Sequence, residues 1–255
     1  MTTSIVITGA SRGLGAALAA RFAAPGTTIG LIGRDAAALA ATAANCAARG
    51  ASTRIATQDV RDGPGMQALL EAWDTALPIT LAIANAGITG GRQADGTMDG
   101  SESARRLVEV NMLGAIHLAE PLIPRMQARQ AGQIAFIASL AGLRGMPDHP
   151  AYSASKAGVI AYADALRAAL RPDNIQISLV MPGYFASDLD AHWTGPKPLA
   201  LSLDTMADRV TTVIRARRGR TMIPRRLGTL LHLLTLLPSP IADRLIRLQR
   251  LTYRP

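Results

Sequence analysis

The stretch from Ser4 to Gly15, SIVITGASRGLG, decides the fold class of this chain. A short β-branched run ends in glycine, and an alanine-rich segment of helical character follows from Leu14 to Ala24. Glycine permits a tight turn and the close approach of a ligand, and the N-terminus of a helix offers free N–H groups to an anion. The stretch therefore predicts a strand–turn–helix unit whose turn holds a phosphate group. A tight turn without a ligand is the plainer alternative.

The same turn also contains the pattern Gly-x-Ser-x-Gly, from Gly9 to Gly13. In one group of hydrolases this pattern places a serine nucleophile, here Ser11, on a sharp turn. That turn normally follows several strands, because an earlier loop has to complete the oxyanion hole. No earlier loop precedes Ser11, so we prefer the phosphate-binding interpretation.

Buried strands and helices continue to alternate along the chain. We expect strands over residues 28–32, 52–57, 81–84, 133–138 and 175–180, and helices ending near residue 49 and over residues 66–76, 103–127 and 151–170. The strands are almost continuously apolar, as in a parallel sheet covered on both faces. The pattern predicts an α/β fold, in which ligands bind beyond the carboxyl ends of the strands.

Composition excludes several classes of protein. The chain has 255 residues, of which 49% are hydrophobic and 18% charged, so one large domain with a sizeable core fits. Aromatic residues make up only 4%, too few for stacking platforms that bind single-stranded nucleic acid. The single cysteine, Cys46, and four scattered histidines exclude a disulfide scaffold and a metal-binding module.

The net charge of +9 favours nucleic acid or an anionic membrane as a partner. However, ten arginines and a single acid, Asp243, lie between Arg215 and Arg254, whereas the preceding part is nearly balanced. The charge is thus a property of the C-terminal tail, and we expect no nucleic acid as a partner. Nothing at the N-terminus resembles a secretion signal, and no uncharged run reaches the ~18 apolar residues of a membrane span. We therefore expect a cytoplasmic protein, with peripheral attachment to the inner face of a membrane as a variant.

The loop after the second expected strand predicts the preferred cofactor. A carboxylate at the end of that strand would bind a ribose 2′-hydroxyl and repel a 2′-phosphate. Gly33 and Arg34 stand there instead, and Arg12 lies in the nearby glycine turn. Guanidinium pairs well with phosphate, so these residues favour NADP(H) over NAD(H). Asp35 is better placed to cap the next helix, and a solvated Arg34 is the alternative.

Tyr152 and Lys156 are spaced four residues apart and therefore share one face of an expected helix. A neighbouring ammonium stabilises a phenolate and lowers the pKa of the phenol, which would make Tyr152 a usable acid or base. Ser139, at the end of a strand, could meet Tyr152 and bond a substrate carbonyl. An ordinary exposed pair and a local turn bond are the alternatives for these residues.

Two further sites stand out. Asn85, Ala86 and Gly87 end the fourth expected strand, where glycine lets a cofactor approach the backbone, or simply makes a turn. Asn111 lies inside an expected long helix although asparagine is a poor helix former. It could kink that helix and bind water, or it could be an exposed side chain.

Together these residues resemble the classical short-chain dehydrogenase/reductase family. The resemblance covers residues 4–187 and includes the glycine turn, Asp59-Val60, Asn85-Ala86-Gly87, Asn111, Ser139, Tyr152-x-x-x-Lys156 and Pro182-Gly183. It implies a Rossmann fold, a doubly wound parallel sheet of seven strands with helices on both faces. It also implies hydride transfer between a nicotinamide ring and a carbonyl or alcohol carbon, and assembly into homodimers or homotetramers.

The resemblance assigns a role to each matched position. Tyr152 would be the catalytic acid/base, Lys156 would lower its pKa and hold the nicotinamide ribose, Ser139 would stabilise the substrate oxygen, and Asn111 would support a proton relay through water. The remaining cofactor contacts implied are Gly9, Ser11, Arg12, Gly13, Leu14, Gly15, Arg34, Asp59, Val60, Asn85, Ala86, Gly87, Pro182, Gly183 and Ser187. Ser187 stands where the family often has threonine, which weakens the expected carboxamide contact there.

The last part of the chain has a different character. We expect residues 1–223 to form the main domain, with a substrate loop over residues 184–203 that includes His192, and residues 224–255 to form a basic tail. Leucines at positions 227, 230, 231, 234 and 237 follow helical spacing. The tail could pack over the substrate pocket, join an oligomer, or lie on an anionic membrane. Two functional alternatives to an NADP(H)-dependent oxidoreductase also remain: a cofactor-binding regulatory protein without turnover, and a binder of membrane surfaces.

Overall fold

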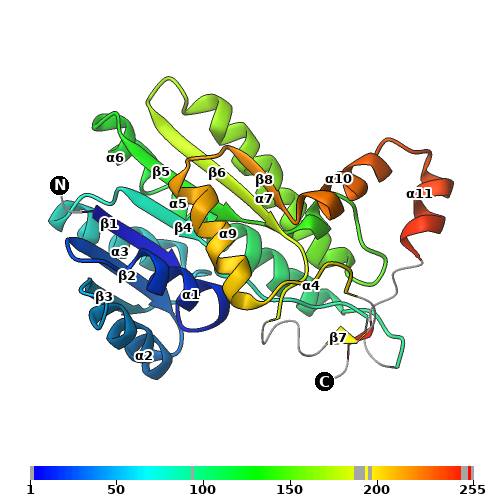
Figure 1. Cartoon of the computed structure of the whole chain (residues 1–255), viewed down its shortest axis with the longest axis horizontal. Coiled ribbons are helices and arrows are strands. Elements are labelled where there is room, and N and C mark those ends of the chain that lie inside the picture. The colour runs from blue at the N-terminus through cyan, green and yellow to red at the C-terminus, as the bar shows by residue number, and fades with distance from the viewer. Residues whose placement is uncertain (1–2, 93–94, 187–192, 195–196, 248–251, 254–255) are drawn as a thin grey trace.

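The computed structural model of the chain describes residues 3–92, 95–186, 193–194, 197–247 and 252–253. Its centre is a parallel sheet in the order β3-β2-β1-β4-β5-β6-β8 (Figure 1). The seven strands are β1 (Thr3–Thr8), β2 (Thr27–Gly33), β3 (Ser52–Thr57), β4 (Leu81–Ala84), β5 (Gly132–Ile137), β6 (Ile175–Pro182) and β8 (Arg220–Ile223). The chain winds outward first in one direction and then in the other, so the direction changes between β1 and β4. A crevice for ligands is expected at this point.

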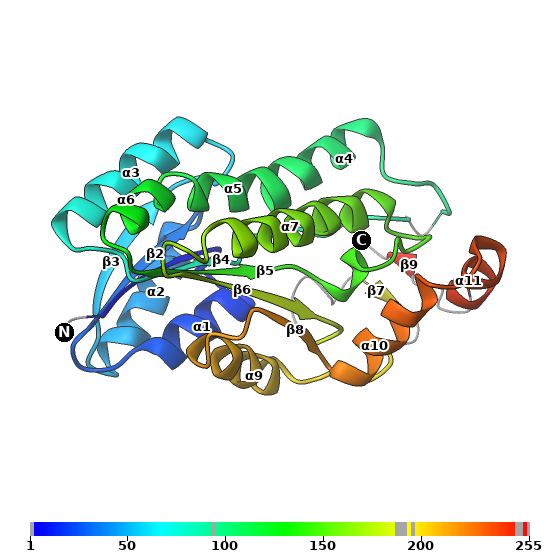
Figure 2. The same ribbon diagram turned by 90° about the horizontal axis from the view of Figure 1, so that it is seen from above.

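Helices cover both faces of the sheet, as the sequence predicts (Figure 2). One face carries α1 (Gly13–Phe22), α2 (Ala36–Ala47) and α9 (Leu203–Arg215). The other carries α3 (Gly63–Ala76), α4 (Ser101–Val108), α5 (Gly114–Ala119), α6 (Ile123–Ala128) and α7 (Pro150–Ala169). The doubly wound Rossmann architecture is thereby confirmed.

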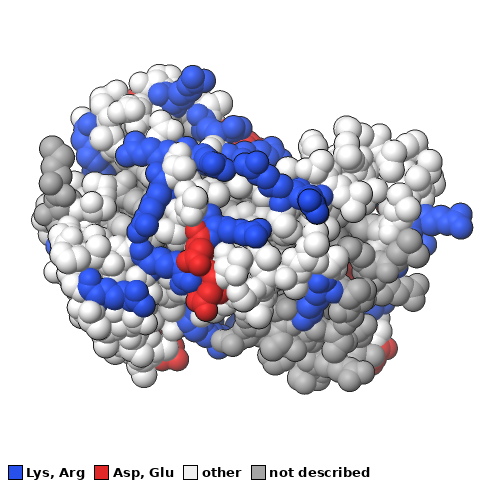
Figure 3. All heavy atoms as spheres, in the orientation of Figure 1, with Lys and Arg blue, Asp and Glu red and all other residues white. Residues whose placement is uncertain are grey.

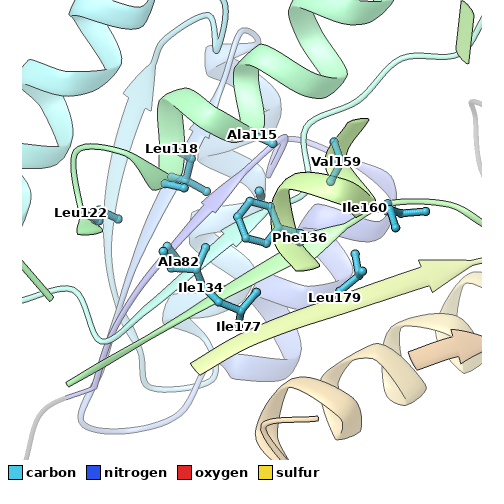
Figure 4. Close-up of a cluster of buried hydrophobic side chains, with 14 of the residues drawn as sticks. Ala82, Ala115, Leu118, Leu122, Ile134, Phe136, Val159, Ile160, Ile177 and Leu179 are labelled. Atoms are coloured by element: carbon cyan, nitrogen blue, oxygen red, sulfur yellow. The ribbon is translucent and has the colours of Figure 1, made fainter. Parts of the chain in front are cut away.

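The apolar strands supply two separate core clusters, one beneath each helical layer. Because successive side chains of a strand point to opposite faces, Val6 belongs to one cluster, whereas Ile5 and Ile7 belong to the other. Phe136 lies among aliphatic side chains of the first cluster (Figure 4). Its ring meets that of Tyr162 edge to face, with the ring centroids 5.7 Å apart. These two clusters explain why most strands read as continuous apolar runs.

The structure departs from the expected strands at both edges of the sheet. β3 is an edge strand and is half-exposed rather than fully covered, with 45% of Ile55 exposed. β8 forms the opposite edge, and its four residues carry no pattern from which we assigned a strand. Pairing with β6 therefore creates this strand more than local sequence preference does.

The single helix expected over residues 103–127 is wrong, since the structure divides it into four parts. A π-helix over Glu109–Leu113 separates α4 from α5, and a turn separates α5 from α6. Pro121 and Pro124 account for the second break, because proline lacks the N–H group that a helix interior requires. Asn111 lies within the π-helix, which agrees with the expected distortion of the helix at this residue.

Beyond β8 the chain forms α10 (Arg225–Leu234) and α11 (Ser239–Ile246), which lie at one end of the molecule in both views (Figures 1 and 2). Two short strands, β7 (Trp193–Thr194) and β9 (Thr252–Tyr253), pair antiparallel to each other. Among the residues that the structure describes, every helix is too short or too polar to cross a lipid bilayer.

Candidate active site

The glycine turn joins β1 to α1 at the carboxyl edge of the sheet. Gly9 and Gly13 adopt φ values of +65° and +54°, which favour glycine. Gly15 is constrained by space, because a Cβ atom there would lie 2.0 Å from the carbonyl oxygen of Gly9. The turn thus brings the first residues of α1 directly against the end of β1, as a phosphate-binding turn requires.

Thr8 and Asn85 fasten this turn to the end of β4. The Oγ1 atom of Thr8 accepts hydrogen bonds from the backbone N–H groups of Asn85, at 3.1 Å, and Ala86, at 3.2 Å. The Asn85 amide donates to the carbonyl oxygens of Thr8, at 3.0 Å, and Gly9, at 3.2 Å. Asn85 therefore shapes the turn with its side chain. Thr8, which we did not assign to the site, is its partner.

The loop after β2 separates a capping acid from an exposed cation. The Asp35 carboxylate accepts a hydrogen bond of 3.0 Å from the Ala38 N–H and caps α2, as predicted. Arg34 is exposed and, like Arg12, borders the cavity described below. The acid next to the strand end is thus engaged with its own helix, while two guanidinium groups face the cavity.

The loop after β3 places Asp59 and Val60 on the same cavity. Arg61 donates hydrogen bonds to the Asp59 carboxylate, and the pKa of Asp59 is lowered chiefly by this interaction. The carbonyl oxygen of Val60 lies 2.8 Å from Nδ1 of His117. These contacts keep the loop in place and Asp59 ionised.

Ser139, Tyr152 and Lys156 come together beyond the end of β5. Ser139 follows the strand, and its Oγ accepts a hydrogen bond of 3.1 Å from the Ala141 N–H. Its hydroxyl is close enough to the Tyr152 phenol to lower the pKa of that phenol. Lys156, one turn further along α7, is only 5% exposed, and its Nζ lies 6.0 Å from the centroid of the Tyr152 ring.

Burial changes the ionisation of both groups. It raises the pKa of Tyr152 above its usual value, an effect that exceeds the lowering by the Ser139 hydrogen bond. It lowers the pKa of Lys156 to about 8, and the ammonium donates a hydrogen bond of 3.1 Å to the carbonyl oxygen of Ile137. The pKa of Tyr152 is therefore raised in the structure, and not lowered as expected from the sequence, because burial is the larger effect. The phenol is protonated at neutral pH.

Asn111 is buried, with 1% of its surface exposed, so the exposed alternative is wrong. Its side chain accepts a hydrogen bond of 2.8 Å from the Ile88 N–H and donates one of 3.0 Å to the Ile88 carbonyl oxygen. It also donates a 3.0 Å hydrogen bond to Oγ of Ser155. The π-helix thus turns this amide toward the loop after β4, which it fixes against α7.

One cavity of about 440 Å³ connects these groups. The glycine turn, the loops after β2, β3 and β4, and the Ser139–Tyr152–Lys156 group all line it, as do Pro182 and Gly183 after β6. A Cβ atom on Gly87 would lie 3.4 Å from Nζ of Lys156, so the ammonium lies close to the backbone after β4. A glycine turn, a buried ammonium and two arginines along one cavity suit a ligand that carries phosphate groups.

Residues 3–197 match the family model described as short chain dehydrogenase. The chain belongs to the short-chain dehydrogenase family. The chain is 34% identical over 224 residues to the ketoacyl reductase HetN of Nostoc sp. strain PCC 7120, over 86% of this chain and 76% of that protein. It is thus an oxidoreductase, and its family acts on hydroxyl and keto groups.

Solved structures share the fold of this chain. A short-chain dehydrogenase from Sphingobium yanoikuyae in complex with NADPH superimposes with a TM-score of 0.77 at 26% identity, over 87% of this chain and 88% of that one. An NAD⁺-bound xylitol dehydrogenase gives a TM-score of 0.77 at 22% identity, over 87% of this chain and 96% of that one. The fold of this chain is therefore shared by one protein solved with NADPH and by another solved with NAD⁺.

Most of the site residues predicted from the sequence line the cavity. The exceptions are Asn111, which is not among the lining residues, and Ser187, which lies outside the described residues together with His192. The cavity has further walls that we did not predict, among them His149, Met146, Leu227 and Leu231. Helical spacing marked Leu227 and Leu231 as one face of a helix, but no local pattern showed what that face covers.

Proposed function

We propose that the protein transfers a hydride between NADP(H) and the carbon of a carbonyl or alcohol substrate, with Tyr152 as acid and base. One observation carries the proposal: the Tyr152 phenol, the Ser139 hydroxyl and the buried Lys156 ammonium are neighbours on the wall of a cavity that begins at the glycine turn. When bound, the nicotinamide ring supplies or accepts the hydride.

In the direction of reduction, negative charge develops on the carbonyl oxygen as the hydride arrives. Tyr152 donates its phenolic proton to that oxygen. Ser139 accepts the Ala141 N–H at its oxygen and keeps its own hydroxyl proton for donation, which in the proposed complex would go to the same substrate oxygen instead of toward Tyr152. Lys156 then stabilises the phenolate that remains, because an ammonium favours a nearby negative charge. In oxidation each of these transfers runs backward.

Asn111 acts in this proposal as a positioning residue. Its Oδ1 and Nζ of Lys156 lie on the same side of Gly87, at 3.3 and 3.4 Å from the position of a Cβ atom there. By holding Ile88, Asn111 fixes the backbone against which Lys156 and the nicotinamide ribose would lie. A proton relay from Lys156 through water near Asn111 remains part of the proposal.

The preference for NADP(H) rests on Arg12 and Arg34. Both border the cavity near the end of β2, where Asp35 is engaged at the N-terminus of α2. A 2′-phosphate placed there would meet guanidinium groups, while the Asp35 carboxylate on the same cavity wall accepts the Ala38 N–H. The same cavity continues past Tyr152 to apolar side chains such as Met146, Leu227 and Leu231, which suit an apolar substrate.

The Tyr152→Phe variant tests the acid/base assignment. NADPH consumption is followed by its absorbance with a panel of ketones and aldehydes, and NADPH affinity is measured separately. We expect the variant to lose at least about 10²-fold in turnover, because general acid catalysis contributes that much, while NADPH still binds. Full turnover by the variant would refute the assignment. Absence of NADPH binding by the wild-type protein would refute the proposal that NADP(H) is the cofactor.

A further inference from the structure

The outward surface of α10 and α11 concentrates exposed apolar side chains. Of the eleven large hydrophobic residues exposed in the described part of the chain, six lie within residues 230–245. They are Leu230, Leu233, Leu236, Leu237, Ile241 and Leu245, with exposed fractions of 40% to 72%. The lobe at the upper right of Figure 3, where Figure 1 places α10 and α11, is accordingly almost free of charged atoms except at its tip. We call these six residues the leucine surface.

Exposed cations flank the leucine surface. Arg225 and Arg226 begin α10, whereas Arg244 and Arg247 lie at the end of α11. The only acid in residues 224–247 is Asp243, which forms an ion pair with Arg144 of the main body. Two arginines thus stand at each end of the segment that carries the leucine surface, with no acid left among them to balance their charge.

We propose that α10 and α11 form a docking surface for an anionic lipid bilayer. The leucine surface would enter the boundary between headgroups and acyl chains, and the arginines would bind lipid phosphates. Helices of ten and eight residues are suited to lie in this boundary, since they are too short to cross the bilayer. The proposal does not depend on the reaction proposed above.

Charge decides between a bilayer and a second copy of the chain. A symmetric pair of leucine surfaces would bring four arginines of one copy close to four of the other, with no acid from either surface to pair with them. An anionic bilayer offers both an apolar interior and phosphates to the same face. The combination of leucines and arginines therefore fits a lipid surface better than a self-complementary contact.

The docking surface is joined to the cavity by α10 itself. Leu227 and Leu231 face inward from this helix, are 5% and 6% exposed, and line the cavity that Tyr152 also lines. Leu230 and Leu233 face outward from the same helix, with 55% and 53% exposed. Docking of the outer face would consequently hold this side of the cavity close to the lipid.

Co-sedimentation with vesicles tests the proposal on the full-length protein. The vesicles are phosphatidylcholine alone and an equimolar mixture of phosphatidylcholine and phosphatidylglycerol. We expect the wild-type protein to bind the anionic vesicles more strongly than the neutral ones, and less strongly at high salt. The L233Q/L236Q variant should lose at least about tenfold in binding, because two leucine side chains no longer enter the lipid. Both residues are exposed, so the fold should tolerate the change.

The Ile55→Thr variant is the matched control, since Ile55 is 45% exposed on β3, at the opposite edge of the sheet. Its vesicle binding should equal that of the wild-type protein. No binding of the wild-type protein to anionic vesicles would overturn the proposal. So would unchanged binding by L233Q/L236Q, or a dimer in solution that this variant dissociates while vesicle binding stays the same.

Discussion

At the scale of single residues, Arg34 and Asp35 show how position along the backbone separates two opposite charges. The Asp35 side chain turns back to the Ala38 N–H and satisfies one of the free donors of α2. Arg34 stays exposed on the border of the cavity. An acid one position earlier, at Gly33, would stand at the strand end and repel a 2′-phosphate. A carboxylate at position 33 would thus oppose a 2′-phosphate, whereas the carboxylate at position 35 caps the next helix.

The Arg34→Asp variant should reverse the preference between the two dinucleotides. Removing a charge-assisted hydrogen bond to phosphate costs about 1.5–3 kcal/mol, so we expect NADPH to bind roughly 10- to 100-fold more weakly. NADH should bind as well as before or better, because the new carboxylate can accept a ribose hydroxyl. Titration of both cofactors gives the ratio of the two dissociation constants.

Arg171→Asp provides the control for this charge reversal. Arg171 is exposed and lies just before β6, at the amino edge of the sheet, away from the cavity. The ratio of NADPH to NADH affinity should not change in this variant. An equal change in both variants would show that net charge, rather than the position of Arg34, sets the preference.

At the scale of elements, the close contact of β1, α1 and β4 is the feature on which the site depends. Three glycines act in the turn for different reasons: Gly9 and Gly13 need positive φ values, and Gly15 needs the absence of a side chain. Thr8 and Asn85 then fix the turn through four hydrogen bonds. Each of these contacts places the N-terminus of α1 where an anion can meet its N–H groups.

Gly15→Ala and Gly13→Ala should therefore differ in stability. A Cβ atom at Gly15 would lie 2.0 Å from the Gly9 carbonyl oxygen and 2.6 Å from the Asn85 amide nitrogen, so backbone has to move. We expect Gly15→Ala to lose about 2–3 kcal/mol of the free energy of unfolding. At Gly13 no atom lies within 4 Å of such a Cβ, and only the positive φ costs about 1 kcal/mol. Urea unfolding of the two variants checks this order, and equal stabilities would contradict it.

Elements also show how far the sequence predicts the structure. The glycine turn, the spacing of Tyr152 and Lys156 and the run of apolar strands are local patterns, and they were sufficient for the fold and most of the cavity. The separate α5 and α6 could have been foreseen from Pro121 and Pro124. Strand β8 and the hydrogen bonds between Asn111 and Ile88 could not have been foreseen, because both depend on partners distant in the chain.

At the scale of the whole molecule, the C-terminal segment is part of the core as well as of the surface. Leu227 and Leu231 belong to the same hydrophobic cluster as Val6 and Phe136. α11 contributes less to the core. Only Ala242 and Ile246 are buried in this helix, and Asp243 forms an ion pair with Arg144. The boundary expected at residue 224 therefore separates segments that share one core.

Two shortened chains should accordingly differ in stability. A chain ending at Pro224 loses the buried side chains of Leu227 and Leu231, and removal of each buried leucine typically costs about 2–5 kcal/mol. We expect it to lose at least about 4 kcal/mol of the free energy of unfolding, with the cavity opened beside Tyr152. A chain ending at Leu237 keeps α10 and should lose only about 2 kcal/mol, because one buried isoleucine and one partly buried ion pair are removed. Urea unfolding followed by circular dichroism measures both. If the chain ending at Pro224 is as stable as the full chain, the conclusion that α10 shares a hydrophobic core with the main domain is wrong.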